Sequence, residues 1–143
     1  MYSIALRFTD NFAPIEGTIK AHEEIINKKG CVWYGKLGHP VSDKIICSVL
    51  DQDDPKILLI LSGGNKRYWA YISDIKKERP SDDAFPSYYQ SRVEDFKTWF
   101  CVNRFEHADK NVMSKWRVVS SKAKLSDTSK HSMSPYFFIE KDE

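Results

Sequence analysis

The side chains in this sequence best suited to recognition chemistry are its large aromatic residues. Six of them fall in segments with a strand-like pattern: Trp33, Tyr34, Trp69, Tyr71, Trp99 and Trp116. Flat rings stack on planar bases, at about 1–3 kcal/mol per base, and several together can enclose a methylated group. Strand alternation places Trp69 and Tyr71 on one face, with residues 68, 70 and 72 on the other. A single tryptophan more often fills a core, so the prediction is collective: at least two of the six line a common pocket.

Polar groups beside these aromatics could read a ligand's edge and hold phosphate. Gly35 and Gly38 permit close backbone approach, although Gly38-His39-Pro40 also reads as a plain turn. The candidate backbone contacts are Lys36, Arg67, Lys115, Arg117, Lys122 and Lys124. The last four belong to a basic stretch that runs from 115 to 130 and carries one acid, Asp127. A solvated loop would show the same composition.

No residue set in the sequence predicts catalysis. Asp95-Phe96-Lys97 matches half of a metal-dependent nuclease core, but the polar residues before it do not suit a buried strand. His22-Glu23-Glu24 lacks the second histidine of a zinc protease. We therefore expect no catalytic residue, no metal and no cofactor.

Length and composition predict one domain over residues 1–143, large enough to bury a core. The net charge of +2 does not demand a polyanionic partner. No apolar run approaches the roughly 20 residues that span a bilayer. For that reason we expect no membrane partner. Three scattered cysteines suggest no disulfide framework, so we expect a reducing, cytoplasmic compartment.

The hydrophobic pattern predicts an α+β fold with an antiparallel meander. Strands are expected over 2–9, 31–35, 44–50, 56–61, 66–75, 98–105, 115–120 and 136–140, and one helix from about 18 to 29. The first strand turns Ile4, Leu6 and Phe8 to one face, and Gly30 stops the helix. The strand at 56–61 reads as buried on both faces. Residues 76–90, with the pair Tyr88-Tyr89, wrap the sheet or form part of a pocket rim.

An opening strand, one helix and then Gly30-Cys-Val-Trp33-Tyr34-Gly35-Lys36 entering a meander resembles the PUA-like superfamily. The closest resemblance is to its EVE and YTH-like branch, which includes reader domains fused to modification-dependent restriction systems of defence. The resemblance implies a small, strongly bent β-barrel flanked by helices. It also implies binding of DNA or RNA, with a modified base held in an aromatic cage.

These observations predict a non-catalytic module that takes a flipped, modified nucleobase into an aromatic pocket. The candidate ligand-binding residues are Trp33, Tyr34, Trp69, Tyr71 and Trp99. The alternative is a sensing or interaction module that grips a small molecule or peptide, as part of a larger protein with a fused or associated effector. Steep salt dependence of binding would separate the first from the second.

Overall fold

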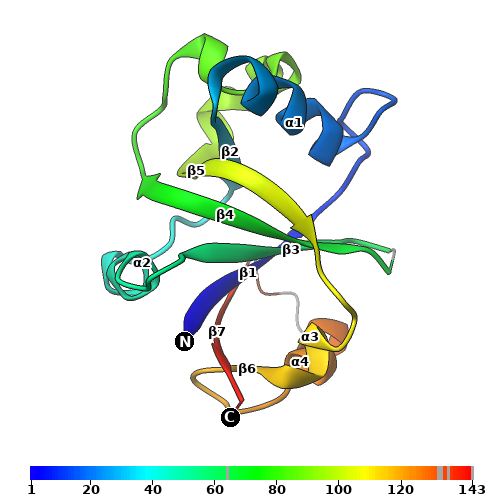
Figure 1. The fold of residues 1–143 in the computed structure, drawn as a ribbon, viewed down its shortest axis with the longest axis vertical. Helices are drawn as coiled ribbons and strands as arrows, with labels where there is room; N and C mark the ends of the chain where they lie inside the picture. The colour runs from blue at the N-terminus through cyan, green and yellow to red at the C-terminus, as the bar shows by residue number, and fades with distance from the viewer. Residues whose placement is uncertain (64, 132–133, 135, 143) are drawn as a thin grey trace.

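The computed structural model describes the chain except for residues 64, 132, 133, 135 and 143. Its elements in chain order are β1 (Tyr2–Phe8), α1 (Thr18–Lys29), β2 (Val32–Leu37), α2 (Asp43–Leu50), β3 (Lys56–Leu61), β4 (Arg67–Lys76), the 3₁₀ segments η1 (Asp82–Ala84) and η2 (Ser87–Asp95), β5 (Phe96–His107), α3 (Val112–Lys115), β6 (Trp116–Val118), α4 (Leu125–His131) and β7 (Tyr136–Lys141). Figure 1 shows α1 and the 3₁₀ segments at one end of the molecule and α3 and α4 at the other.

The strands form one mixed sheet in the order β2-β5-β4-β3-β1-β7-β6. The predicted meander holds for β3, β4 and β5, which pair antiparallel in succession. The all-antiparallel expectation is wrong at one place, because β1 pairs parallel to β3. The connection between them contains α1, β2 and α2, which is long enough for a parallel crossover.

The sheet curls strongly but does not close into a hydrogen-bonded barrel. Trp69 on β4 lies 5.3 Å from Trp116 on β6 between ring centroids, although three strands separate them in the sheet order. At the other edge, the Lys36 ammonium on β2 lies 5.1 Å from the ring centroid of Tyr136 on β7. Side chains, not backbone pairs, therefore span the gaps, and among the described strands β2 and β6 remain edges.

The predicted first helix is confirmed, including its end. Gly30 takes the left-handed conformation (φ 88°) and its N–H bonds to the Ile26 carbonyl. Lys28 and Lys29 lie in the last turn, where positive charge favours the helix dipole. At the start, the Thr18 N–H donates to Asp10 Oδ1 at 3.0 Å. This anchors α1 to the loop after β1.

The predicted strand at 44–50 is wrong, since these residues form α2. The Ser42 hydroxyl accepts a hydrogen bond from the Ile45 N–H, and Asp43 sits in the first turn, as at a helix N-terminus. Ile45 and Val49 are four residues apart, so both can face the sheet. Their β-branched side chains favour a strand. The Ser42 cap and the packing of one side of the segment against the sheet stabilise a helix instead.

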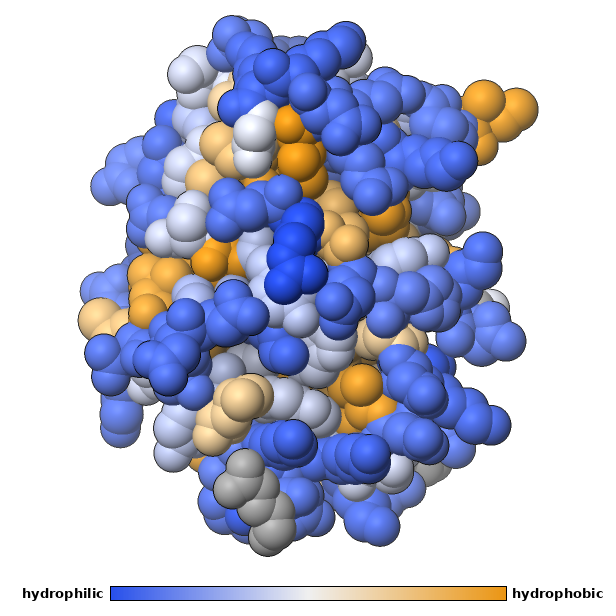
Figure 2. All heavy atoms as spheres, in the orientation of Figure 1, coloured by the Kyte–Doolittle hydropathy of each residue, from blue (hydrophilic) through white to orange (hydrophobic). Residues whose placement is uncertain are grey.

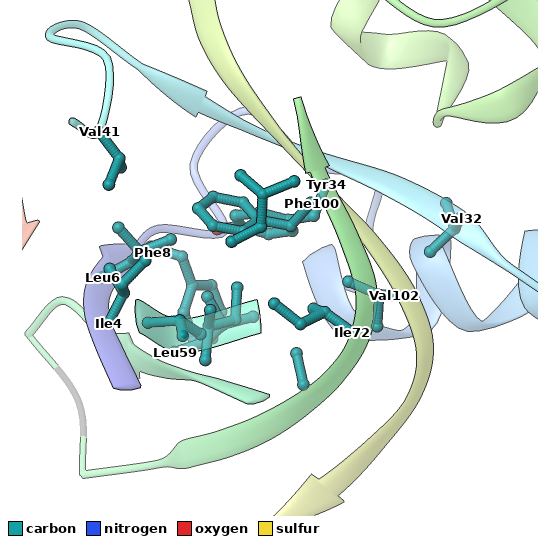
Figure 3. Packing of buried hydrophobic residues seen from close by; sticks show 14 residues of the cluster. Ile4, Leu6, Phe8, Val32, Tyr34, Val41, Leu59, Ile72, Phe100 and Val102 are labelled. Atoms are coloured by element: carbon teal, nitrogen blue, oxygen red, sulfur yellow. The ribbon is translucent and has the colours of Figure 1, made fainter. Parts of the chain in front are cut away.

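The curled sheet buries apolar side chains on both faces. One face packs residues of β1, β2, β3, β4 and β5 against α1 and α2. Figure 3 labels ten residues of this cluster: Ile4, Leu6, Phe8, Val32, Tyr34, Val41, Leu59, Ile72, Phe100 and Val102. The other face packs against β6, β7, α3 and α4. The predicted alternation on β4 is confirmed, because Ala70 and Ile72 lie in the first core and Trp69 and Tyr71 in the second. The expected two-sided burial of β3 is confirmed at Ile57, Leu58 and Leu59.

The C-terminal part contains more helix than the pattern suggests. Strand β6 is only three residues long, and the short helices α3 and α4 flank it. Leu125, which opens α4, is fully buried in the second core. Within the described residues no helix has the length and apolar character needed to cross a bilayer. The face in Figure 2 is largely hydrophilic, with small separated apolar areas.

Candidate functional site: an aromatic pocket beside β1 and β2

The structure distributes the five candidate aromatic residues over three clusters. Trp69 and Tyr71 lie in the core beneath β6 and β7. Tyr34 lies in the core beneath α1. Trp99 belongs to a third cluster with Phe85, Tyr89 and Val93, and Trp33 packs against its edge. The five therefore do not meet in one cage.

Trp69 and Tyr71 are covered by cations of the chain itself. The Lys56 ammonium lies 4.3 Å from the Trp69 ring centroid, and the Arg104 guanidinium lies 3.6 Å from that of Tyr71. Glu106 accepts a hydrogen bond from the Tyr71 hydroxyl at 3.3 Å. Each cation thus occupies one ring face on which a ligand could otherwise stack.

A different set of aromatic residues surrounds an open pocket of about 260 Å³, named here the aromatic pocket. Its aromatic lining is Phe8, Phe12, Tyr34, Tyr88, Tyr89 and Phe96. It lies where the end of β1 approaches β2, two strands that are not hydrogen-bonded neighbours in the sheet. The pocket thus occupies a gap that the curled sheet leaves unpaired.

The rear wall of the pocket is a stack of rings. Phe96 stacks on Tyr89 with ring centroids 4.4 Å apart and an interplanar angle of 29°. Behind them lies Trp99, whose side chain has no exposed surface and whose ring centroid is 5.3 Å from that of Phe96. Trp99 therefore supports the pocket from behind and does not line it.

A buried hydrogen-bond chain holds Tyr89 in place. The His22 Nδ1 lies 2.8 Å from the Thr18 carbonyl, which can only accept, so Nδ1 carries the ring proton. The neutral Nε2 then accepts from the Tyr89 hydroxyl at 2.7 Å, and that hydroxyl accepts from the Gly35 N–H at 3.3 Å. Burial lowers the pKa of His22 to about 4 and raises the pKa of Tyr89 well above its ordinary value. The His22 imidazole, the Tyr89 hydroxyl and the Gly35 N–H are therefore all hydrogen-bonded in their neutral forms.

Gly35 is required by close packing against the same wall. A Cβ at this position would stand 2.7 Å from Phe96 Cδ1 and 2.8 Å from its Cγ. Aromatic rings cannot bend away, so a side chain here must displace Phe96 from Tyr89. The sequence predicts a close approach of Gly35 to a ligand, whereas in the structure Gly35 packs closely against a pocket wall.

We expect Gly35→Ala to lower the free energy of unfolding by about 1–2 kcal/mol through this overpacking. The measurement is urea unfolding of the wild type, Gly35→Ala, Phe96→Ala and the double variant. If the clash with Phe96 is the cause, the double variant is no less stable than Phe96→Ala alone, because alanine lacks the clashing Cγ and Cδ1 atoms. Additive losses in the double variant would contradict this cause.

The rim of the pocket carries an exposed ring paired with a cation. Phe12 is 62% exposed, and the Arg92 guanidinium lies 4.7 Å from its ring centroid. Arg92 also lines the pocket, as do Arg7 and the hydroxyl-bearing residues Thr9, Thr18, Ser62 and Ser91. Among the described residues that line it, none is acidic.

The candidate phosphate-binding residues are also separated. Lys36 is buried, donates to the Leu37 and His39 carbonyls, and has its pKa lowered by burial. Arg117 and Lys122 both bond Glu140 Oε2 at 2.8 Å, so a carboxylate already offsets their charge. Lys115 and Lys124 are exposed. Arg67 differs from these, because it lines a second, basic pocket.

The pattern partly anticipated the aromatic pocket. The pair Tyr88-Tyr89, expected to wrap the sheet or to form part of a pocket rim, lines the pocket as part of its wall. Phe12 and Phe96 were not singled out, since a loop phenylalanine and the centre of an Asp-x-Lys segment give no periodic signal. The flanking residues Asp95 and Lys97 are exposed, at the junction of η2 and β5.

Comparison with known proteins gives one match. A family model described as Pua-like matches residues 4–137. Neither a curated protein nor a solved structure matches the chain.

Proposed function

This chain belongs to the Pua-like family, and on that premise we propose that it is a non-catalytic binding module for nucleic acid. In this proposal a flipped nucleobase enters the aromatic pocket and stacks against its rings. Tyr34, Tyr88, Tyr89 and Phe96 form the walls and Phe12 the rim. Of the five candidate residues chosen from the sequence, Tyr34 alone then touches the ligand, and Trp99 acts as support.

The observation that carries the proposal is the make-up of the aromatic pocket. Stacked rings offer flat apolar faces, and Arg7 and Arg92 add positive charge at the opening. At about 260 Å³ the pocket is slightly smaller than clefts for drug-sized ligands, which are about 300–1,000 Å³. That size suits one base better than an extended peptide.

The resemblance described above supports four more specific proposals. The chain would belong to the EVE and YTH-like branch, prefer a modified base, bind DNA or RNA and act with an associated effector. A cytoplasmic location agrees with the free state of Cys31, Cys47 and Cys101.

Phe12→Ala tests the pocket with little risk to the fold, because the ring is mostly exposed. We expect roughly tenfold weaker binding of an oligonucleotide that carries the preferred base, the low end of the loss for one stacking ring. The measurement is fluorescence anisotropy across a set of single-stranded oligonucleotides with different base modifications.

Ile15→Ala is the matched control, since Ile15 lies in the same loop, is fully exposed and does not line the pocket. Equal losses in the two variants would mean that the loop and not the pocket binds. Binding that does not change with salt would favour the small-molecule or peptide alternative, because phosphate contacts release counterions.

A further inference from the structure

A second cavity of about 500 Å³, named here the basic pocket, adjoins the aromatic pocket. The two share Arg7 and Ser62 as lining residues. Its walls come from the end of β1, the β3–β4 hairpin, α3 and α4. In Figure 1 this hairpin projects on the same side of the molecule as α3 and α4.

The basic pocket concentrates positive charge without acidic groups. Its cationic residues are Arg7, Arg67, Lys110 and Lys130, and none of the described lining residues is acidic. Arg7 Nη2 donates to the backbone carbonyl of Ser129, and within the described part of the chain no ion pair joins Arg7 to a carboxylate. This contrasts with Arg117 and Lys122, whose charges are offset by Glu140.

Arg67 carries a donor that the fold leaves unused. Its Nε is buried and has no hydrogen-bond partner among the described residues. Buried donors without partners are rare in folded proteins, and a bound ion is one explanation for them. The side-chain amide of Asn111 also lines the pocket and can donate to an anion, whereas the Ser114 hydroxyl already donates to the Asn111 carbonyl at 3.0 Å.

We infer that the basic pocket binds one phosphate of the nucleic-acid backbone, adjacent to the base in the aromatic pocket. This inference rests on the proposed function. Two guanidinium groups match the geometry of phosphate oxygens, and Lys110 and Lys130 add charge at the exposed edge. Arg7, on the wall shared by both pockets, sets the position of the phosphate relative to the base. The phosphate contact would fix which base of a strand enters the aromatic pocket.

The test uses the variant Lys110→Gln/Lys130→Gln, which removes two exposed charges and leaves both guanidinium groups. Binding of the preferred single-stranded oligonucleotide is measured at several salt concentrations. We expect a shallower slope of log affinity against log salt, by up to about 0.7, the value for one phosphate on a single strand. The matched control is Lys28→Gln/Lys44→Gln, which removes the same charge from exposed sites outside both pockets. An equal change of slope in the control would overturn the inference.

Position is tested with oligonucleotides in which one phosphate is replaced by an uncharged methylphosphonate. For the wild type we expect the main loss when the replacement is next to the recognised base. The Lys110→Gln/Lys130→Gln variant keeps both guanidinium groups, so it should show a smaller loss at the same position. Equal losses at every position would show general attraction and overturn the inference.

Two outcomes separate this inference from the proposed function. If the modified base is preferred but the neighbouring methylphosphonate has no effect, the proposed function stands and the phosphate site is wrong. If an abasic oligonucleotide binds as well as the preferred one, and both lose affinity in the lysine variant, the base pocket is wrong and the phosphate site stands. If inorganic phosphate binds the pocket but oligonucleotides do not displace it, a free anion is the ligand and the inference is overturned.

Discussion

Replacing Tyr89 with Phe is expected to lower the free energy of unfolding by about 3 kcal/mol. The hydroxyl it removes is the partner of two buried groups, His22 Nε2 and the Gly35 N–H. A buried polar group left without its partner costs roughly 1–3 kcal/mol. The change adds no volume, so lost hydrogen bonds and not packing would explain the result. Chemical denaturation at neutral pH measures it.

The exchange rate of the Gly35 amide provides a local readout of the same change. This amide should exchange faster with solvent in Tyr89→Phe, since its acceptor is gone. Tyr2→Phe is the control: Tyr2 is partly exposed and stacks on Phe138 through its ring, so stability should change by less than about 0.5 kcal/mol. A Tyr89→Phe protein as stable as the wild type would show that the hydrogen-bond chain contributes nothing net.

The second large effect is a loss of stability in mild acid caused by His22. Its pKa is about 4 in the folded protein against an ordinary value of 6.5, and burial is the main cause. Between these values the unfolded chain binds a proton at His22 that the folded chain does not. Stability is therefore fully present above pH 6.5 and falls as the pH drops toward 4. Between pH 7 and pH 5 we expect a loss of about 2 kcal/mol from this residue alone.

The measurement is urea unfolding of the wild type and His22→Gln at pH 7 and at pH 5. His22→Gln should be less stable at pH 7, because it loses hydrogen bonds, but its stability should change less with pH. The control His39→Gln removes an exposed histidine and should keep the pH dependence of the wild type. An identical pH dependence in all three proteins would rule out His22 as the source. Tyr89 depends on the neutral imidazole, so the ligand affinity of the folded protein should weaken only as the pH approaches 4, where the folded His22 gains its proton.

Local sequence determined most of the elements. The strand pattern of β1, β3 and β4 and the helix ended by Gly30 follow from alternation, apolar runs and a glycine stop, which act within a few residues. The α2 segment is the exception among long elements, since its strand-forming side chains conflict with the Ser42 cap. In that segment, packing on one face of the sheet outweighed intrinsic propensity.

Tertiary structure alone decided which aromatic residues share a pocket. Tryptophan on a strand can point to either face, and the curl of the sheet brings Trp116 onto Trp69 while burying Trp99 behind Phe96. Phe12, Tyr34 and Tyr88 meet only because β1 and β2 approach across a gap with no backbone pairing. The sequence alone predicted an aromatic binding site, because many large aromatic residues fall in predicted strands. The residues that form that site depend on contacts between segments far apart in the chain, and local pattern carries no information about them.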